Sequence, residues 1–174
     1  MMHRSITVIV AAILLTQPNM SRTTAEGYAK VVQEEASKRH FDPYTVVSMV
    51  HFESRWQAGV ESGGCVGLGQ VCLSNYPFCR QDPTGDRCQA KRASLLDGVA
   101  NLRAVGAAIT ANRRFCRKKT GRAKFHHWLA SYGGFNKPGE GHWCGQRKVR
   151  GRWRDLPIPH IVNRVMKRRR KLMR

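Results

Sequence analysis

The stretch that decides the fold is DPYTVVSMVHFESRW, residues 42–56. Asp42 is a favourable N-cap, and Pro43 suits the first helical position because a backbone N–H would be unpaired there. The run Tyr44–Ser54 continues with helical periodicity, so we predict a helix that begins at Asp42-Pro43. With 100° per residue, Glu53 falls on the most apolar side of this helix.

An inward-facing Glu53 has a chemical consequence. Burial disfavours the ionised form of a carboxyl group, and the negative end of the helix dipole acts in the same direction, so we expect a raised pKa. A carboxyl group that keeps its proton at neutral pH and faces a cleft can act as the general acid that breaks a glycosidic bond. The alternative is a structural ion pair, with Arg55 or with a more distant arginine.

The chain has 174 residues, and its first 25 have the pattern of a secretory leader. Arg4 supplies the positive charge, the stretch from Ile6 to Leu15 is apolar, and small residues end at Ala25, after which we expect cleavage. The apolar stretch is about half as long as a membrane-spanning helix. The rest, residues 26–174, has the length of one domain.

The six cysteines all follow the leader. An even number in an exported chain favours three disulfides, whose pairing spacing alone leaves open. Because there is no Cys-x-x-Cys pair, we expect no metal and no cofactor. The cysteines are Cys65, Cys72, Cys79, Cys88, Cys116 and Cys144.

The charge balance calls for an anionic partner. The formal net charge is +20, and removal of the leader, with Arg4 and Arg22, leaves 29 basic and 11 acidic residues, or +18. An exported chain meets acidic cell-wall polymer or lipid more readily than nucleic acid, so we expect no nucleic-acid partner. Basic residues crowd the last turn of the final helix, and this C-terminal end is the expected contact with an anionic cell-wall or membrane surface.

Hydrophobic periodicity and turn residues predict a mainly α, disulfide-stabilised domain. No strand pattern stands out. The helices that we expect, in addition to the one at Asp42-Pro43, cover residues 25–39, 91–113, 124–132 and 157–171.

Four motifs in order resemble the lytic transglycosylase family. They are Glu53-Ser54, the glycine-rich segment Ser62–Gln70, the helix with Asn101 and Gly106, and Ala130-Ser131-Tyr132. The resemblance extends from about Asp42 to Tyr132. It implies a lysozyme-like helical fold and cleavage of peptidoglycan.

The resemblance also implies roles for single residues. Glu53 matches the family's acid/base, which protonates the bond between N-acetylmuramic acid and N-acetylglucosamine and then activates the muramoyl C6 hydroxyl. The product is a 1,6-anhydro sugar. The substrate-binding positions matched in this sequence are Ser54, Gly67, Leu68, Gln70 and Tyr132.

Departures from the family pattern leave the site partly altered. Gly133 stands where the family has asparagine, so Asn136 is a candidate to replace it, and Ile161 stands where a tyrosine is usual. Cys65 and Cys72 flank the loop where relatives have alanine and proline. These changes predict a divergent, disulfide-stiffened branch.

Two other functions remain open at this point. The first is a lysozyme-type hydrolase that uses water, with Glu61, Asp82, Asp86 or Glu140 as a second carboxylate. The second is a non-catalytic cationic protein that binds the cell wall. In each case we expect a monomeric protein of the bacterial envelope, secreted or periplasmic, with peptidoglycan glycan strands as its partner.

Overall fold

The computed structural model describes residues 5–121 and 124–174 and is mainly helical. The chain divides into two compact units, residues 1–106 with 173 and residues 107–172 with 174, and each is described by itself. Eight α-helices lie in the described residues: α1 Ile6–Thr16, α2 Arg22–Arg39, α3 Pro43–Glu53, α4 Pro77–Gln81, α5 Asp86–Leu96, α6 Gly98–Thr120, α7 Phe125–Tyr132 and α8 His160–Leu172.

The helix that begins at Asp42-Pro43 is confirmed as α3. The Asp42 carboxylate caps it by accepting a hydrogen bond from the Tyr44 N–H at 2.9 Å. Every residue from Pro43 to Val50 is buried, which makes α3 the central helix of the first unit. Only its last turn reaches partial exposure.

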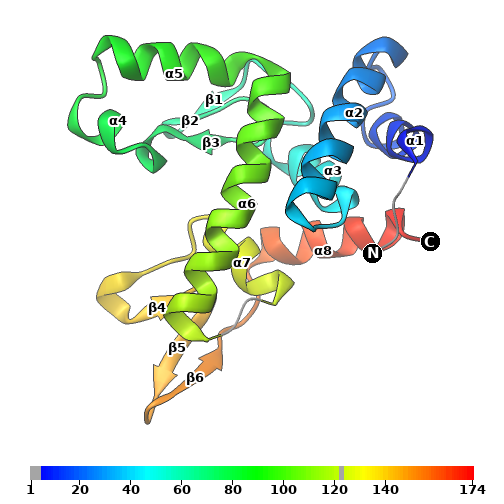
Figure 1. The fold of residues 1–174 in the computed structure, drawn as a ribbon. Coiled ribbons are helices and arrows are strands. Elements are labelled where there is room, and N and C mark those ends of the chain that lie inside the picture. Colours follow the sequence, from blue (N-terminus) through cyan, green and yellow to red (C-terminus); the bar gives the residue numbers. More distant parts are fainter. Residues whose placement is uncertain (1–4, 122–123) are drawn as a thin grey trace. The chain divides into compact units, whose positions relative to one another are not determined.

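The prediction of one helix over residues 91–113 was wrong. The chain breaks at Asp97, whose backbone is extended, and the Asp97 carboxylate accepts a hydrogen bond from the Ala100 N–H at 2.7 Å. A side chain that can cap a helix competes with continued helix at this position. The result is two helices, α5 and α6, instead of one (Figure 1).

The expectation that strands are absent was also wrong. Two three-stranded antiparallel sheets are present, each built from short strands whose residues carry little alternating apolar pattern. The strands are β1 Glu61–Ser62, β2 Cys65–Val66 and β3 Val71–Cys72 in the first unit, and β4 His142–Trp143, β5 Gln146–Val149 and β6 Arg152–Asp155 in the second.

All six cysteines form disulfides, as predicted. Taken in order along the chain, the first cysteine bonds to the second, the third to the fourth and the fifth to the sixth. The pairs are Cys65–Cys72, Cys79–Cys88 and Cys116–Cys144. Three disulfides indicate an oxidising or extracellular environment. None of the described helices has the length and apolar character needed to cross a membrane.

Most of the described part of the predicted leader is helical, in α1 and in the first residues of α2. Helix α1 buries Ile9 and Ile13 completely in the first unit, and the Trp56 indole N–H donates a hydrogen bond to the Thr16 hydroxyl at 3.0 Å. Ala25, the expected cleavage point, is itself buried within α2. Cleavage stays a prediction, and it would remove the first residues of α2 together with the polar partner of Trp56.

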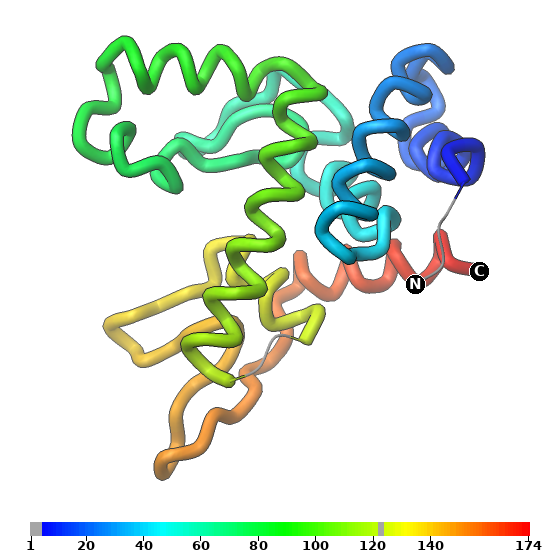
Figure 2. The backbone as a smooth tube through the Cα atoms, viewed as in Figure 1, coloured from blue at the N-terminus to red at the C-terminus, as the bar shows by residue number. Residues whose placement is uncertain are grey.

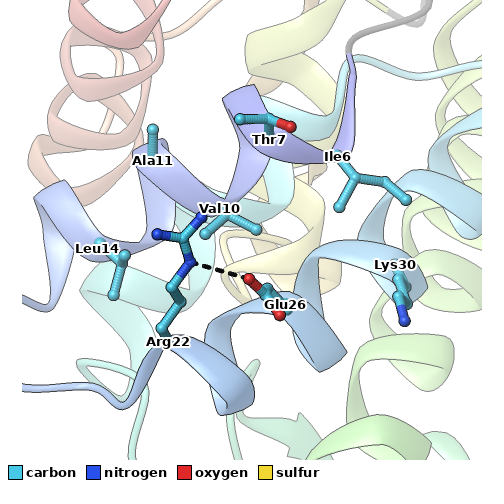
Figure 3. Close-up of a pocket in the computed structure, with 8 residues that line it drawn as sticks. All are labelled: Ile6, Thr7, Val10, Ala11, Leu14, Arg22, Glu26 and Lys30. Atoms are coloured by element: carbon cyan, nitrogen blue, oxygen red, sulfur yellow. Dashed lines mark hydrogen bonds and ion pairs between the residues drawn. The ribbon is translucent and has the colours of Figure 1, made fainter.

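A pocket between α1 and α2 lies in the same region (Figure 3). Six of its eight lining residues belong to the predicted leader, and none is a predicted site residue. Arg22 and Glu26, one turn apart on α2, form an ion pair 3.0 Å long on the α2 side of this pocket (Figure 3). The pocket is mostly apolar and is lined by Ile6, Thr7, Val10, Ala11, Leu14, Arg22, Glu26 and Lys30.

A polar cluster of two buried side chains and one exposed carboxylate joins α7, β5 and β6 in the second unit. The imidazole of His127 is completely buried, with its Nε2 3.0 Å from an Asp155 carboxylate oxygen, and Gln146 donates to the same oxygen at 2.7 Å. Burial lowers the pKa of His127, so the neutral imidazole donates from Nε2. Burial opposes ionisation of Asp155, but the two hydrogen bonds hold its pKa below the ordinary value.

Candidate active site

Glu53 is the last residue of α3 and is half-buried. Burial raises the pKa of its carboxyl to about 7. Within residues 5–121 and 124–174, no side chain forms a hydrogen bond or an ion pair with this carboxyl group. The structural ion pair that the sequence left open, with Arg55 or a more distant arginine, is therefore not formed among these residues.

The glycine-rich segment folds as a hairpin tip. Residues 67–70 connect β2 to β3, and Cys65 lies directly opposite Cys72 in the register, where the disulfide joins them. Gly67 has a φ of +76°, a conformation that favours glycine. A Cβ at this position would collide with the Asn101 amide and the Leu95 carbonyl.

Asn101 ties this hairpin tip to α6. Its side-chain oxygen accepts a hydrogen bond from the Gly69 N–H at 2.8 Å, and its amide nitrogen donates to the carbonyls of Val66 at 2.8 Å and Leu95 at 2.7 Å. The side chain is completely buried, so all three bonds are shielded from water. A single polar side chain in the apolar stripe of α6 thus sets the position of the loop.

Gly106, which the resemblance also singled out, has a packing role. A Cβ at Gly106 would meet the side chain of Glu35, which is buried in α2 and paired with Arg39. The glycine therefore lets α6 approach α2 closely. This contact positions Asn101 one and a half turns earlier on the same helix.

Ser54 connects α3 to the hairpin tip. Its hydroxyl is buried and donates a hydrogen bond to the Leu68 carbonyl at 2.7 Å. The structure thus directs Ser54 toward the protein backbone, so a direct bond from its hydroxyl to a sugar is not available in this arrangement. Ser54 acts as a positioning residue between Glu53 and the loop.

The other loop residues differ in what they can offer a substrate. The Leu68 side chain is completely buried and belongs to the core. Gln70 is half-buried, and its amide nitrogen donates to the carbonyls of Val60 at 2.9 Å and Gly67 at 3.0 Å. With both donors held by the loop, the carbonyl oxygen is the part of Gln70 that can accept a bond from a sugar.

Tyr132 and the departures next to it lie in the second unit. Tyr132 ends α7 and is half-buried. The Asn136 amide donates to the Ser131 hydroxyl at 3.0 Å, and its oxygen accepts from the Cys144 N–H at 2.8 Å. Asn136 therefore holds the backbone of its own segment, which argues against the role proposed for it in place of Gly133.

The four candidates for a second carboxylate are exposed, and three have other partners. Arg92 donates to both oxygens of Glu61, at 2.7 and 3.0 Å, and Glu140 pairs with Lys137 at 3.0 Å and His142 at 3.1 Å.

Asp82 accepts hydrogen bonds from the backbone of its own turn, including the Gly85 N–H at 2.8 Å, and Asp86 stands exposed in the first turn of α5. None of the four shares the partly buried, unpaired setting of Glu53.

No protein-family model and no curated protein matches the sequence, and no solved structure matches the fold.

Proposed function

We propose that this protein is a peptidoglycan lytic transglycosylase with a lysozyme-like fold. The observation that carries the proposal is the Glu53 carboxyl group, which is unpaired among the described residues and whose pKa burial raises to about 7. At neutral pH a large fraction of such groups is protonated and can donate the proton that a leaving sugar requires. Deprotonated, the same group is a base of useful strength.

The proposed reaction uses Glu53 twice. Its proton goes to the glycosidic oxygen between N-acetylmuramic acid and N-acetylglucosamine as the bond to muramoyl C1 breaks. The resulting carboxylate removes the proton from the muramoyl C6 hydroxyl, whose oxygen bonds to C1. Glu53 ends protonated, and the products are a 1,6-anhydromuramoyl end and a free N-acetylglucosamine end.

The settings of the other carboxylates favour a nucleophile supplied by the substrate. A glycosidase that hydrolyses its substrate with water, whether it inverts or retains the configuration at the anomeric carbon, usually needs a second carboxylate across the cleft. Glu61 and Glu140 are held by cations, and Asp82 is held by its own turn. Asp86 stands exposed in the first turn of α5, so Glu53 alone among these five carboxyl groups is both partly buried and, within the described residues, unpaired, which suits the transglycosylase reaction better than hydrolysis.

We place the bound glycan strand against the disulfide-closed hairpin tip, which Ser54 ties to the end of α3. The backbone of this tip is held from both sides, by Ser54 and by Asn101, so little ordering is required when a glycan strand binds. Gly67 and the Gln70 carbonyl oxygen are the positions at which we place sugar contacts.

The proposed setting is the bacterial envelope, and the proposed partner is peptidoglycan. The disulfides fit an extracytoplasmic location, and the net charge of +20 fits an anionic wall or membrane surface. On α8, exposed cations at Lys167, Arg170 and Lys171 supply the contact expected of the C-terminal end. The protein acts as a monomer.

The test is digestion of purified cell wall by wild type and by Glu53→Gln. We expect the variant to lose at least about 100-fold in lysis, the lower end of the range for one general acid/base, while it still binds the wall. Glu34→Gln, on the exposed face of α2, is the matched control and should keep full activity. Mass spectrometry should find anhydromuramoyl ends.

Three other outcomes of the digestion would contradict the proposal. Reducing ends of normal mass would replace the transglycosylase with a hydrolase. Wild-type protein that binds the wall but never cleaves it would leave the non-catalytic binder, and Glu53→Gln with wild-type lysis would refute the assigned role of Glu53.

A further inference from the structure

The hairpin of β5 and β6 is a strongly cationic part of the second unit. A two-residue turn, Arg150-Gly151, joins the strands, and both residues have positive φ values of 48° and 79°, as hairpin turns of the I′ class require. Five of the ten residues from 146 to 155 are basic, namely Arg147, Lys148, Arg150, Arg152 and Arg154. All five are exposed.

The register gathers three of these residues on one side. Arg147 pairs with Arg154 and Val149 with Arg152, and these positions alternate with the pairs Gln146–Asp155 and Lys148–Trp153. Because successive side chains of a strand point to opposite faces, Arg147, Arg152 and Arg154 share one face. We call these three residues the arginine face.

None of the five cations is neutralised within the part of the chain that the structure describes. No ion pair or side-chain hydrogen bond involves them, and the one acidic residue of the hairpin, Asp155, is held by His127 and Gln146. Like charges directly opposite each other destabilise a strand pair. The hairpin therefore keeps a repulsion that an anionic ligand would relieve.

The base of the hairpin is firmly anchored, whereas its tip projects from the unit (Figure 2). Gln146 is completely buried, the Leu156 N–H donates to the Gly145 carbonyl at 2.8 Å, and Cys144 is bonded to Cys116. The cations thus stand on a rigid support, which lowers the entropy cost of binding.

Protection of an edge strand is the simplest explanation of charge on β6, which lies at the edge of its sheet. Such protection commonly uses a charged residue, especially lysine, on the edge strand itself. Here the cations extend to the inner strand β5 and to the turn, and four of the five are arginine. Arginine's planar fork of donors suits bidentate recognition of phosphate.

We propose that the arginine face binds a flexible polymer of phosphodiester-linked units in the cell envelope. Arg152 and Arg154 lie two residues apart on one strand, about 6.7 Å, and Arg147 lies opposite Arg154, so neighbouring phosphates of a flexible polyanion can each meet an arginine. Membrane insertion is disfavoured because Val149, 38% exposed, is the one large apolar side chain exposed on the hairpin. Nucleic acid is disfavoured because Trp153 is on the opposite face, away from the arginines.

The test measures binding of the full chain to poly(glycerol phosphate) by calorimetry over a range of salt concentrations. For flexible strands each neutralised charge contributes about −0.7 to the slope of log K against log salt. The triple variant Arg147→Gln/Arg152→Gln/Arg154→Gln should reduce the slope by about 2 and weaken low-salt binding at least about tenfold. Because it removes opposed like charges, its urea midpoint should not fall.

The control variant removes the same number of exposed charges from α6 in the same unit, as Arg114→Gln/Arg117→Gln/Lys118→Gln. We expect its slope to change by less than about 0.7. Equal losses in the two variants would overturn the proposal, because net charge alone would then explain binding.

Equally tight binding of poly-glutamate with matched charge would remove the phosphate preference. The triple variant can also be tested with anionic vesicles and with single-stranded DNA. If it weakens binding to one of these more than binding to poly(glycerol phosphate), that ligand would replace the proposed partner. These measurements do not depend on Glu53, so the proposal and the enzymatic function can fail separately.

Discussion

Glu53 should make the stability of the folded protein depend on pH in a direction unusual for a glutamate. Its pKa in the folded chain is about 7, against an ordinary value of 4.5, because burial penalises the charged form. Between these values the unfolded chain is ionised at this position while the folded chain keeps its proton. Folding then takes up a proton, and stability falls as the pH rises from about 4.5 through 7.

The size of this effect follows from the two pKa values. A difference of that size corresponds to about 3.4 kcal/mol. Because the Glu53 side chain is only half-buried, water screens part of the interaction, and we expect about half, ~1.7 kcal/mol. Glu53→Gln removes the ionisation but keeps the shape of the side chain. We therefore compare the difference in unfolding free energy, variant minus wild type, at two pH values. This difference should be larger at pH 8 than at pH 4.5 by that amount.

The assay is urea denaturation of both proteins at pH 4.5, 6 and 8, with the disulfides intact. In a thermal scan the same difference corresponds to about 3–7 °C at pH 8. Glu34→Gln, whose side chain is 65% exposed, is the control and should change by less than about 0.5 kcal/mol over this range. A Glu53→Gln difference that stays constant with pH, or a wild type that gains on the variant as the pH rises, would refute the burial of a protonated carboxyl group.

Two further predictions concern the loop and a disulfide. Gly67→Ala should lower the unfolding free energy in urea by more than about 2 kcal/mol, because the new Cβ combines a positive φ with a collision. Gly63→Ala, which has a positive φ but open space around it, should cost about 1 kcal/mol. Equal costs would show that the loop can shift. The bridge between Cys116 and Cys144 closes 28 residues, so replacing both by alanine should cost about 3.5 kcal/mol by loop entropy. The two shorter bridges should cost about 2.5 kcal/mol each, and the reverse order would contradict the chain-entropy account.

Local sequence signals predicted some features of the site well. The Asp42-Pro43 start defined α3, and periodicity placed Glu53 at its partly buried end. Both signals act within a few turns of helix, where propensity and capping decide the outcome. The same reasoning missed the break at Asp97, because an aspartate in a segment with helical periodicity can either continue a helix or cap a new one.

Other features depended on contacts between distant parts of the chain. The family resemblance assigned Ser54 and Leu68 to the substrate site, and only the fold shows that the Ser54 hydroxyl donates to the Leu68 carbonyl and that the leucine side chain is buried. Asn101 was noticed only through a resemblance, although one amide in an apolar stripe is itself a signal of a buried hydrogen-bonding role. Its three partners lie 6, 32 and 35 residues away in sequence.

Short-range periodicity and composition were enough to predict the helical class, the three disulfides and the placement of Glu53 on the apolar side of its helix. Tertiary structure alone decided which cysteines pair, that Glu53 lacks a charged partner among the described residues, and that three arginines share one face of a hairpin. The physical reason is that pairing and register depend on distances between residues far apart in the chain, which packing sets and periodicity does not encode.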